Sequence, residues 1–338
     1  MEDELETWLR PLNAFVEYAS ETEEILKRRE SKAREAEQDQ WLASHFINLR
    51  QAAEANAEIC RKIAQIGVEM LDEESIKVLG DEEFKATPLD AEKVRSTLRQ
   101  FAREWSSDGR SERAACFDRI VTALLKEFPD GKAKVVVPGS GLGRLPCELA
   151  KYGFHAVGNE FSVHMVYASN FILNLSPSAN YTSIHPYIHN YSHIRTRADQ
   201  LAPVSIPDMW PAESLAGELE MAVGDFIESF AEADPVDAVA TAFFLDTTDD
   251  IYTTINTISN LVRPGGIWTN FGPLLWHFDG DPDRCGLELC MEDLITLIKS
   301  SGWSITTLET DVETTYCQSP NAMGGFVYKC LFFVAKRI

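Results

Sequence analysis

The chain has 338 residues, of which 45% are hydrophobic and 25% are charged, and its formal net charge at pH 7 is −22. This length and composition predict a soluble globular protein with one α/β domain and additional helices. The negative charge argues against a nucleic-acid partner and against binding to anionic membranes. The seven cysteines are dispersed and form no C-x-x-C pair, so we expect free thiols rather than disulfides or a zinc site.

The first 79 residues predict helices, because apolar residues recur at helical spacing and no glycine occurs before Gly67. Within them, the segment 21–40 is densely charged, and we expect a solvent-exposed helix or connector there. We therefore divide the chain into an N-terminal helical region, 1–85, and a ligand-binding domain, 86–338. The helical region either covers the domain or forms a homodimer contact, and the sequence does not separate these alternatives.

The chain shows no targeting or membrane-spanning pattern. Its N-terminus is acidic and does not resemble a signal or transit peptide. No apolar run reaches the length that a transmembrane helix needs. We expect a cytoplasmic or nuclear protein.

A helix is expected from Pro88, with Asp90 as its N-cap. Gln100 and Arg103 are three positions apart on this helix and therefore share a face. The two side chains either belong to a solvated face or reach the carboxylate of a cofactor from a lid helix. In the second case Arg103 would clamp that carboxylate with two hydrogen bonds. A further amphipathic helix over 112–128 leads into the next segment.

Residues 134–160 predict one βαβ unit: a strand, a glycine turn, a helix, a second strand and an acid. The β-branched run 135–137 is typical of a buried parallel strand. Gly139 and two further glycines follow it at alternate positions, which permits a tight turn and lets a ligand approach the backbone. Glu160 ends the second strand, where its carboxylate can accept hydrogen bonds from a ribose diol.

The spacing of the glycines bears on which nucleotide is bound. A dinucleotide fingerprint reads G-x-G-x-x-G, whereas this turn reads G-x-G-x-G and continues with Arg144. The chain also has no second half with a fingerprint of its own. The pattern favours a single nucleoside ligand such as S-adenosylmethionine. A nicotinamide oxidoreductase and a non-catalytic protein with a vestigial site are the alternatives.

The stretch 176–211 has no clear period, and we expect a long irregular segment that forms a wall of the active site. It contains His185, His189 and His193, whose spacing of four residues could place them on one helical face as zinc ligands. Pro186 weakens a continuous helix, and no carboxylate stands at a matching offset. We therefore expect no metal.

Two acids follow the next strands. Asp225 comes just after the short strand 221–223 and can accept a hydrogen bond from an adenine amine, while Phe226 can cover the ring. The apolar run 236–245 predicts the central strand, and it ends in Asp246. Because ligands bind at the carboxyl ends of strands in open α/β sheets, Asp246 is a catalytic or substrate-binding candidate. The alternative is an N-cap of the following helix.

The C-terminal part completes the predicted sheet. His277 follows the strand 267–271 and either binds substrate or is structural. The strands 303–307 and 328–335 predict an antiparallel hairpin, and Tyr316 lies in the linker between them. The result is an α/β fold, a seven-stranded and mostly parallel Rossmann-like sheet with an N-terminal helical region.

Several longer motifs are ordered along the chain: V-P-G-S-G-L-G-R-L at 137–145, G-N-E-F-S at 158–162, F-F-L-D-T at 243–247 and G-P-L-L-W-H-F at 272–278. They resemble the carnosine N-methyltransferase family, and the resemblance extends from about Leu89 to the C-terminus. It implies a class I methyltransferase that uses S-adenosylmethionine. The implied reaction methylates an imidazole nitrogen of histidine in carnosine and gives anserine.

Residue roles follow from this resemblance. It implies that the cofactor is contacted by Gln100, Arg103, Gly139, Glu160, Asp225 and Phe226. It implies that a small histidine-containing dipeptide is contacted by Phe243, Asp246, His277, Tyr316 and Tyr328. Asp246 would accept from one imidazole N–H and so hold the tautomer whose other nitrogen attacks. Between Tyr316 and Tyr328 the sequence keeps the spacing of the family but not its residues, so the dipeptide specificity stays open. Histidine within a protein is the alternative substrate.

Overall fold

The computed structural model describes residues 2–37, 39–213, 215–281 and 286–338. Contacts between residues divide the chain into two compact units. The helical unit comprises Met1–Gly109, Val163–Pro211 and Cys317–Gly325. The sheet unit comprises Arg110–Ser162, Ala212–Tyr316 and Phe326–Ile338. Each unit is assembled from separate stretches of chain, and a folding-domain boundary at residue 85 stays a prediction.

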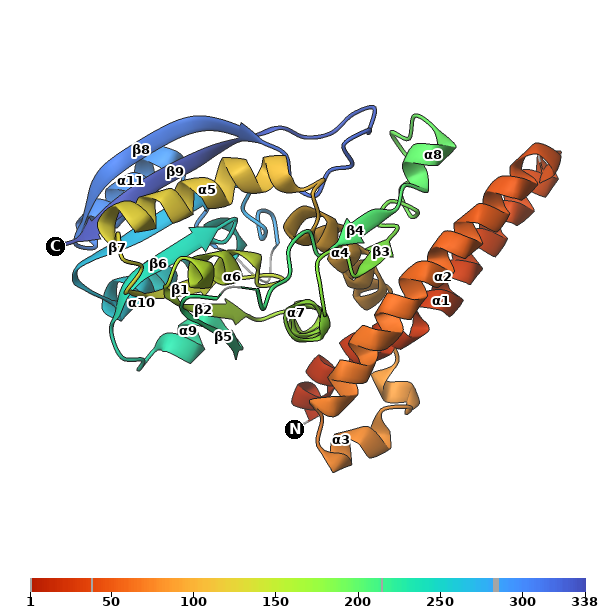
Figure 1. The fold of residues 1–338 in the computed structure, drawn as a ribbon, viewed down its shortest axis with the longest axis horizontal. Coiled ribbons are helices and arrows are strands. Elements are labelled where there is room, and N and C mark those ends of the chain that lie inside the picture. Colours follow the sequence, from red (N-terminus) through yellow and green to blue (C-terminus); the bar gives the residue numbers. More distant parts are fainter. Residues whose placement is uncertain (1, 38, 214, 282–285) are drawn as a thin grey trace. The chain divides into compact units, whose positions relative to one another are not determined.

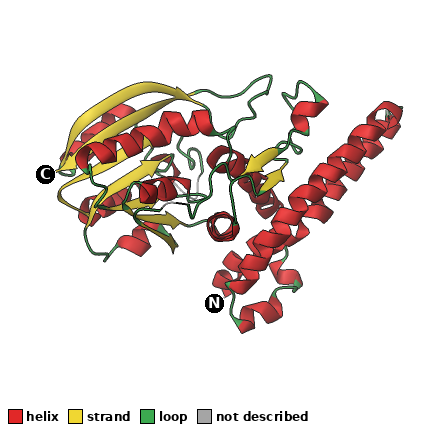
Figure 2. Cartoon of the chain, in the orientation of Figure 1, coloured by secondary structure: helices red, strands yellow, loops and turns green. Residues whose placement is uncertain are grey.

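The helical unit is built around a hairpin of two long antiparallel helices, α1 (Glu2–Glu35) and α2 (Asp39–Glu69) (Figures 1 and 2). The prediction of helices over the N-terminal region is confirmed. The unit's other elements are α3 (Glu73–Val78), η1 (Glu82–Phe84), α4 (Pro88–Trp105), α7 (Val163–Leu175), β3 (Thr182–Ile184), α8 (Arg197–Gln200) and β4 (Val204–Ile206).

The charged segment 21–40 buries more than its composition suggests. Helix α1 continues to Glu35, and Leu26 and Ala33 are buried against Phe46 of α2. Leu26 and Ala33 are seven residues apart, so they lie on one face two turns apart. The expectation of a merely solvent-exposed helix is therefore wrong on this face.

Helix α4 begins one residue after its cap, which is Thr87 and not Asp90 as predicted. The Thr87 hydroxyl accepts from the N–H of Asp90 at 3.2 Å, and Asp90 Oδ2 accepts from the N–H of Thr87 at 3.0 Å. This is a capping box, in which Asp90 occupies the third helical position. Both residue types cap helices well, and Pro88 at the first helical position decides the register.

The segment 176–211 is less irregular than predicted, because β3 and β4 pair antiparallel and α8 lies between them. A buried side chain of α2 fastens it to the helical hairpin. Asn56 Oδ1 accepts from the N–H of His185 at 2.7 Å, and Asn56 Nδ2 donates to the Tyr18 hydroxyl at 2.9 Å. The role of this segment as a wall of the active site stays a prediction.

The described residues of the sheet unit form a sheet of seven strands in the order β5-β2-β1-β6-β7-β9-β8 (Figure 1). Only β9 is reversed: it runs antiparallel to β7 and to β8. This confirms the predicted Rossmann-like fold of class I methyltransferases. The strands are β1 (Lys134–Pro138), β2 (His155–Glu160), β5 (Glu218–Val223), β6 (Val236–Ala242), β7 (Val262–Gly272), β8 (Trp303–Thr314) and β9 (Tyr328–Arg337).

Helices cover both faces of this sheet, as the alternation of side chains along a buried strand requires. Val135 and Val137 face the core that includes α5 (Arg110–Glu127) and α6 (Arg144–Lys151). Val136 faces the opposite core, to which three helices contribute. These are α9 (Phe226–Phe230), α10 (Ile251–Leu261) and α11 (Met291–Ser300).

None of the helices in the described ranges combines the length and the apolar composition that crossing a membrane requires. The six described cysteines are free thiols, as expected. Cys285 lies outside the described residues.

Candidate functional site

A glycine turn connects β1 to α6 at the carboxyl end of a central strand. Gly139, Gly141 and Gly143 have positive φ angles of 61°, 56° and 77°, which other residues rarely adopt. A Cβ atom on Gly139 would lie 2.8 Å from the Phe244 ring. The Ser140 hydroxyl in this turn is buried and has no hydrogen-bond partner among the described residues. A bound polar ligand would satisfy such a group.

Glu160 ends β2, as predicted, and its side chain is buried. Its Oε2 accepts a hydrogen bond of 2.8 Å from the N–H of Gly141, and its Oε1 accepts one of 2.8 Å from the N–H of Ser162. Burial raises the pKa of the Glu160 carboxyl, and the N–H donors counteract that rise. Because each carboxylate oxygen has a further lone-pair site, this arrangement fits an acceptor for a ribose diol.

Asp225 follows β5, which pairs in parallel with β2, so it lies at the same edge of the sheet as Glu160. Its Oδ1 accepts from the N–H of Glu228 at 3.0 Å and caps the short helix α9. Phe226 is buried, and its ring meets the Phe244 ring edge-on at a centroid distance of 5.7 Å. Phe226 is thus part of the core beside the glycine turn, and its contact with adenine stays a prediction.

Strand β6 ends at Ala242, three residues before the end predicted at Leu245. The next residue, Phe243, has a left-handed φ of 54°, a conformation that is unfavourable for a bulky side chain and that clusters at functional sites. Its N–H donates to the carbonyl of Phe271 at 2.8 Å, and its ring centroid lies 4.8 Å from that of Tyr316. The turn after β6 therefore brings two predicted substrate residues into contact.

Asp246 lies on a 3₁₀ turn, η2 (Leu245–Thr247), rather than directly at a strand end as predicted. Its side chain is only 3% exposed, and its Oδ2 accepts from the N–H of Leu275 at 2.9 Å. Its carbonyl oxygen accepts from the N–H of His277 at 2.9 Å. Burial raises the pKa of the Asp246 carboxyl, and the Leu275 N–H opposes this shift.

The alternative role of Asp246, an N-cap of the next helix, is wrong. Asp250 caps α10 instead, because its Oδ1 accepts from the N–H of Thr253 at 2.9 Å. A buried carboxyl that caps no helix at the ligand edge of a sheet is a candidate for chemistry.

The remaining predicted substrate residues lie on loops and strand ends near this turn. His277 is exposed, although its backbone is bonded to that of Asp246. Tyr328 begins β9 opposite Thr314 of β8, and Tyr316 lies two residues beyond that pair. Tyr328 and Phe243 are both partly buried and pack against the same core. The end of the β8–β9 hairpin thus brings aromatic side chains to the turn after β6.

Gln100 and Arg103 lie on α4 in the helical unit, and both are buried rather than on a solvated face. Arg103 Nη1 lies 3.8 Å from Glu104 Oε1. The solvated-face interpretation is therefore wrong. Their contact with a cofactor stays a prediction.

The three spaced histidines are not on one helical face, because the described chain from 185 to 193 is not helical. His185 Nδ1 lies 2.8 Å from the carbonyl oxygen of Leu201, and His189 Nε2 lies 3.0 Å from the Tyr18 hydroxyl. His193 packs against Gly324. Each ring thus has surroundings of its own.

Comparison with known proteins gives a consistent result. The model of the carnosine N-methyltransferase family matches residues 80–338. A carnosine N-methyltransferase from Mus musculus is 34% identical over 349 residues, which cover 99% of this chain and 86% of the mouse protein. One from Schizosaccharomyces pombe is 33% identical over 317 residues, covering 88% of this chain and 84% of that protein. The solved structure of TehB from Haemophilus influenzae is 12% identical, covers 65% of this chain and 62% of TehB, and has a TM-score of 0.43, too low to support an argument.

Proposed function

Because the chain belongs to the carnosine N-methyltransferase family, we propose that it methylates an imidazole nitrogen of histidine in carnosine or a related histidine-containing dipeptide. The product from carnosine would be anserine. The observation that carries the proposal is the buried carboxyl of Asp246, which accepts a hydrogen bond from the N–H of Leu275. It lies three residues after Phe243, whose ring contacts that of Tyr316.

The glycine turn fits the nucleoside part of S-adenosylmethionine. Glu160 would accept hydrogen bonds from the ribose hydroxyls, and the buried Ser140 hydroxyl would gain a partner. Asp225 would accept from the adenine amine, while Gln100 and Arg103 would bind the methionine carboxylate. When bound, S-adenosylmethionine supplies an electrophilic methyl group on a sulfonium. Because displacement on that carbon must be in line, the protein's main contribution is alignment.

Asp246 would select the nitrogen that attacks. A neutral imidazole has one N–H donor and one acceptor nitrogen, and only the acceptor has a lone pair for attack. Asp246 would accept from the N–H and so hold one tautomer. As the ring becomes an imidazolium, the carboxylate would stabilise the new charge, more strongly in a buried site than in water. The carboxyl must be ionised for this role. Burial raises the pKa of Asp246, and the N–H of Leu275 counteracts that rise.

Aromatic side chains would bind the imidazole ring. Phe243 and Tyr316 already contact each other, and Tyr328 lies at the start of the neighbouring strand. Aromatic faces favour a ring that develops positive charge. His277 is exposed and linked through its backbone to Asp246, so it would hold the other end of the dipeptide.

The test is product identification. The purified protein would be incubated with S-adenosylmethionine and one candidate substrate at a time. The candidates are carnosine, homocarnosine, free histidine and a histidine-containing protein fragment. Mass spectrometry would detect methylation, and NMR would identify the nitrogen. We expect one nitrogen of a dipeptide to be methylated. Methylation of the protein fragment alone would favour the alternative substrate, and binding of NAD instead of S-adenosylhomocysteine would refute the enzyme class.

A matched pair of variants makes this test specific. Asp246→Asn should abolish most of the product, whereas Asp249→Asn changes the same charge at an exposed neighbouring position and should not. Equal loss in both variants would count against a specific role for Asp246.

A further inference from the structure

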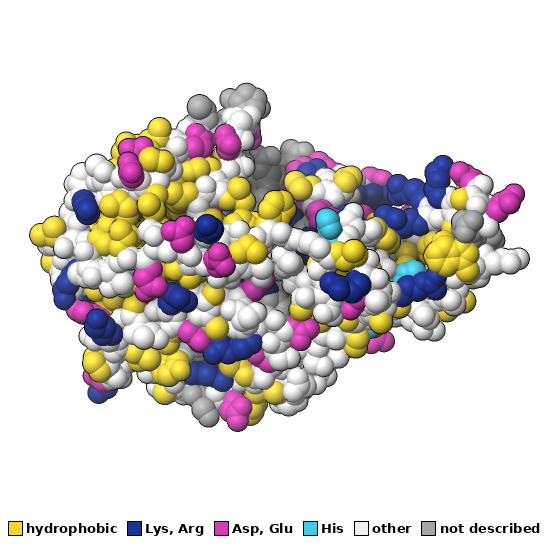
Figure 3. All heavy atoms as spheres, turned by 90° about the horizontal axis from the view of Figure 1, so that it is seen from above, with side chains coloured by type: hydrophobic (Ala, Val, Ile, Leu, Met, Phe, Trp, Pro, Cys, Tyr) yellow, Lys and Arg dark blue, Asp and Glu magenta, His cyan; other side chains and the backbone are white. Residues whose placement is uncertain are grey.

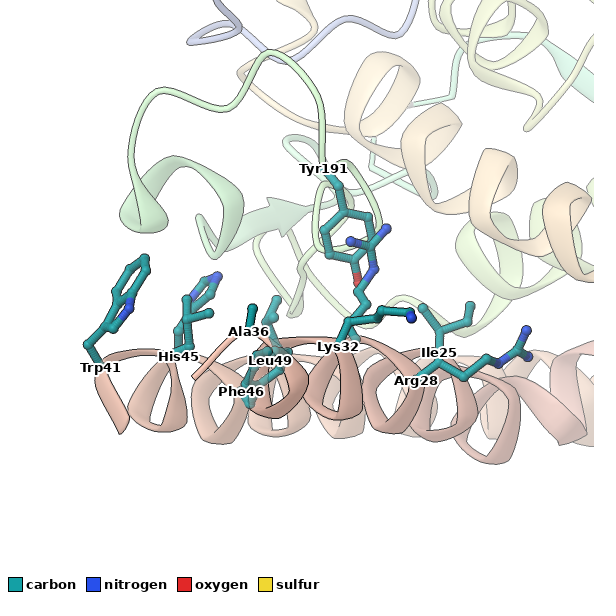
Figure 4. Close-up of a pocket in the computed structure, with 12 residues that line it drawn as sticks. Ile25, Arg28, Lys32, Ala36, Trp41, His45, Phe46, Leu49 and Tyr191 are labelled. Carbon is teal, nitrogen blue, oxygen red and sulfur yellow. The ribbon is translucent and has the colours of Figure 1, made fainter. Parts of the chain in front are cut away.

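The helical unit carries a groove of its own, independent of the proposed function. It lies between the α1–α2 hairpin and the segment that carries Tyr191, and its volume is about 690 Å³ (Figure 4). Figure 4 shows Tyr191 reaching from this segment toward Lys32 and Ile25, which rise from the hairpin. A groove of this size is large enough for several side chains of a ligand.

The floor of the groove is apolar. Phe46 and Leu49 of α2 line it and are buried, together with Ala33 of α1. Trp41 lies at one end and is 58% exposed. An exposed tryptophan next to buried apolar side chains is typical of a binding surface, because such rings contribute most when a partner covers them.

The rim of the groove is basic, in a chain whose net charge is −22. Arg28, Arg29 and Lys32 line it, and no Asp or Glu among the described residues does. Arg28 forms no ion pair with any described residue, and Arg29 lies over the Tyr191 ring at 3.2 Å. Figure 3 shows Lys and Arg side chains gathered around an apolar patch near the tip of the hairpin. The groove therefore complements negative charge while most of the surface repels it.

The length of the groove indicates the shape of its occupant. The lining residues run from Ile25 of α1 to Ala36, which directly follows the end of that helix. At 1.5 Å per residue this span corresponds to about 16 Å, or three turns of a helix. An apolar floor of that length with charged edges is the geometry in which one amphipathic helix binds another protein.

We propose that this groove docks a partner protein through an amphipathic helix that carries acidic residues beside its apolar stripe. The apolar stripe lies on Phe46 and Leu49, and the acidic residues pair with Arg28 and Lys32. The existing ion pair of Lys32 with Glu35 is exposed, so exchanging it costs little.

The test uses the whole 338-residue chain and two fluorescein-labelled model peptides of about eleven residues, the length of three helical turns. Both carry leucines at positions i, i+3, i+4 and i+7. One has glutamates on the flanks of the stripe, and the other has lysines there. Fluorescence anisotropy should show that the glutamate peptide binds at least tenfold more tightly, and that added NaCl weakens it. Equal binding of the two peptides, or no binding of either, would overturn the proposal.

Variants locate the binding. The double variant Arg28→Glu, Lys32→Glu should lower the affinity for the glutamate peptide at least tenfold. The matched control is Lys27→Glu, Arg61→Glu, which changes the same charge at exposed positions outside the groove and should bind normally. Trp41→Ala should weaken both peptides, and circular dichroism would verify folding. The proposal fails if both double variants bind alike.

Two other occupants are distinguishable. Binding of dodecanoate by a protein that binds neither peptide would make the groove a lipid site. A concentration-dependent dimer that Arg28→Glu, Lys32→Glu abolishes, without peptide binding, would make it a contact between copies of this chain. Either result overturns the proposal.

Discussion

The two units organise their candidate residues differently. In the sheet unit, Glu160 and Asp225 follow neighbouring parallel strands, so the topology alone brings them to one edge. In the helical unit, Gln100, Arg103 and the spaced histidines depend on which way a helix or loop faces, which no strand register determines. In a parallel sheet, the position of a residue at a strand end is therefore enough to predict that it lies at the site. On a helix, side-chain contacts must also be known.

The largest effect should come from Asp246 in the sheet unit. We expect Asp246→Asn to lower kcat/KM for a histidine dipeptide by about two to four orders of magnitude, or roughly 3–5 kcal/mol of transition-state stabilisation. The amide has no charge and can turn a donor toward the ring. Affinity for S-adenosylmethionine should stay the same, which calorimetry would verify. A variant with most of its turnover and unchanged nitrogen selectivity would show that Asp246 is structural.

Glu160 should act on the cofactor rather than on turnover of bound substrate. Glu160→Ala removes the expected ribose acceptor and should weaken S-adenosylmethionine binding by about 1–3 kcal/mol. Isothermal titration calorimetry measures this directly. Unchanged affinity would contradict the role of Glu160 as the ribose acceptor. It would also mean that a strand end in the sheet unit predicts a binding residue no better than a helix position does.

Arg103 tests the helical unit. Arg103→Ala should weaken S-adenosylmethionine binding by about 1–2 kcal/mol, because a charge-assisted hydrogen bond to the carboxylate is lost. A thermal melt would show whether the fold is intact. If the melting temperature drops while cofactor affinity is retained, α4 is structural and only the sheet edge binds the cofactor.

A smaller effect on stability should distinguish the two buried carboxyls. Burial raises the pKa of Asp246, so the folded protein holds a proton that the unfolded chain has lost, and the free energy of unfolding falls as pH rises through the folded pKa. Asp246→Asn removes this penalty and should raise Tm at pH 8. The gain should shrink as pH falls from the raised pKa of the folded protein toward the ordinary aspartate pKa, and it should be absent below that value.

Glu160→Gln is the counterpart in this experiment. Both oxygens of Glu160 accept from backbone N–H groups, so the amide nitrogen would face a donor, and we expect no stabilisation. Calorimetric melts of the ligand-free variants at several pH values would compare them. A similar gain in both variants would mean that burial alone, rather than the N–H bonds, decides their stability.

Removal of metal should have no effect. His185, His189 and His193 have separate neighbours, so exhaustive chelation should leave methyltransferase activity unchanged. Stoichiometric zinc in the purified protein, measured by mass spectrometry of the metal, would contradict this prediction.

Predictability follows the same division. The seven-stranded sheet and the place of Glu160 could be predicted, because apolar runs indicate where the strands lie and the glycine turn fixes the βαβ unit that ends in Glu160. The turn after β6 could not, since nothing in the letters F-F-L-D-T indicates that Phe243 takes a left-handed conformation. Ser140 and Phe244 were missed for a related reason: a serine among glycines, or a second phenylalanine after a strand, has no distinctive pattern.

In the helical unit the errors have another origin. Thr87 and Asp90 are both good caps, and only the register of α4 decides between them. The segment 21–40 looked solvent-exposed because its two buried apolar residues, Leu26 and Ala33, are widely spaced among charges. The burial of such a short apolar face can be recognised only when the helix that packs against it is known.

The strand order also bears on how the chain folds during synthesis. Strand β1 pairs with β2, the next strand in the sequence, and with β6, which is synthesised much later. About 100 residues separate β1 from β6, so at ribosomal rates one edge of β1 stays open for roughly 5–20 s. During that interval the nascent chain exposes an apolar strand edge, which is a template for aggregation. The α1–α2 hairpin, whose contacts are local, can form before that edge emerges.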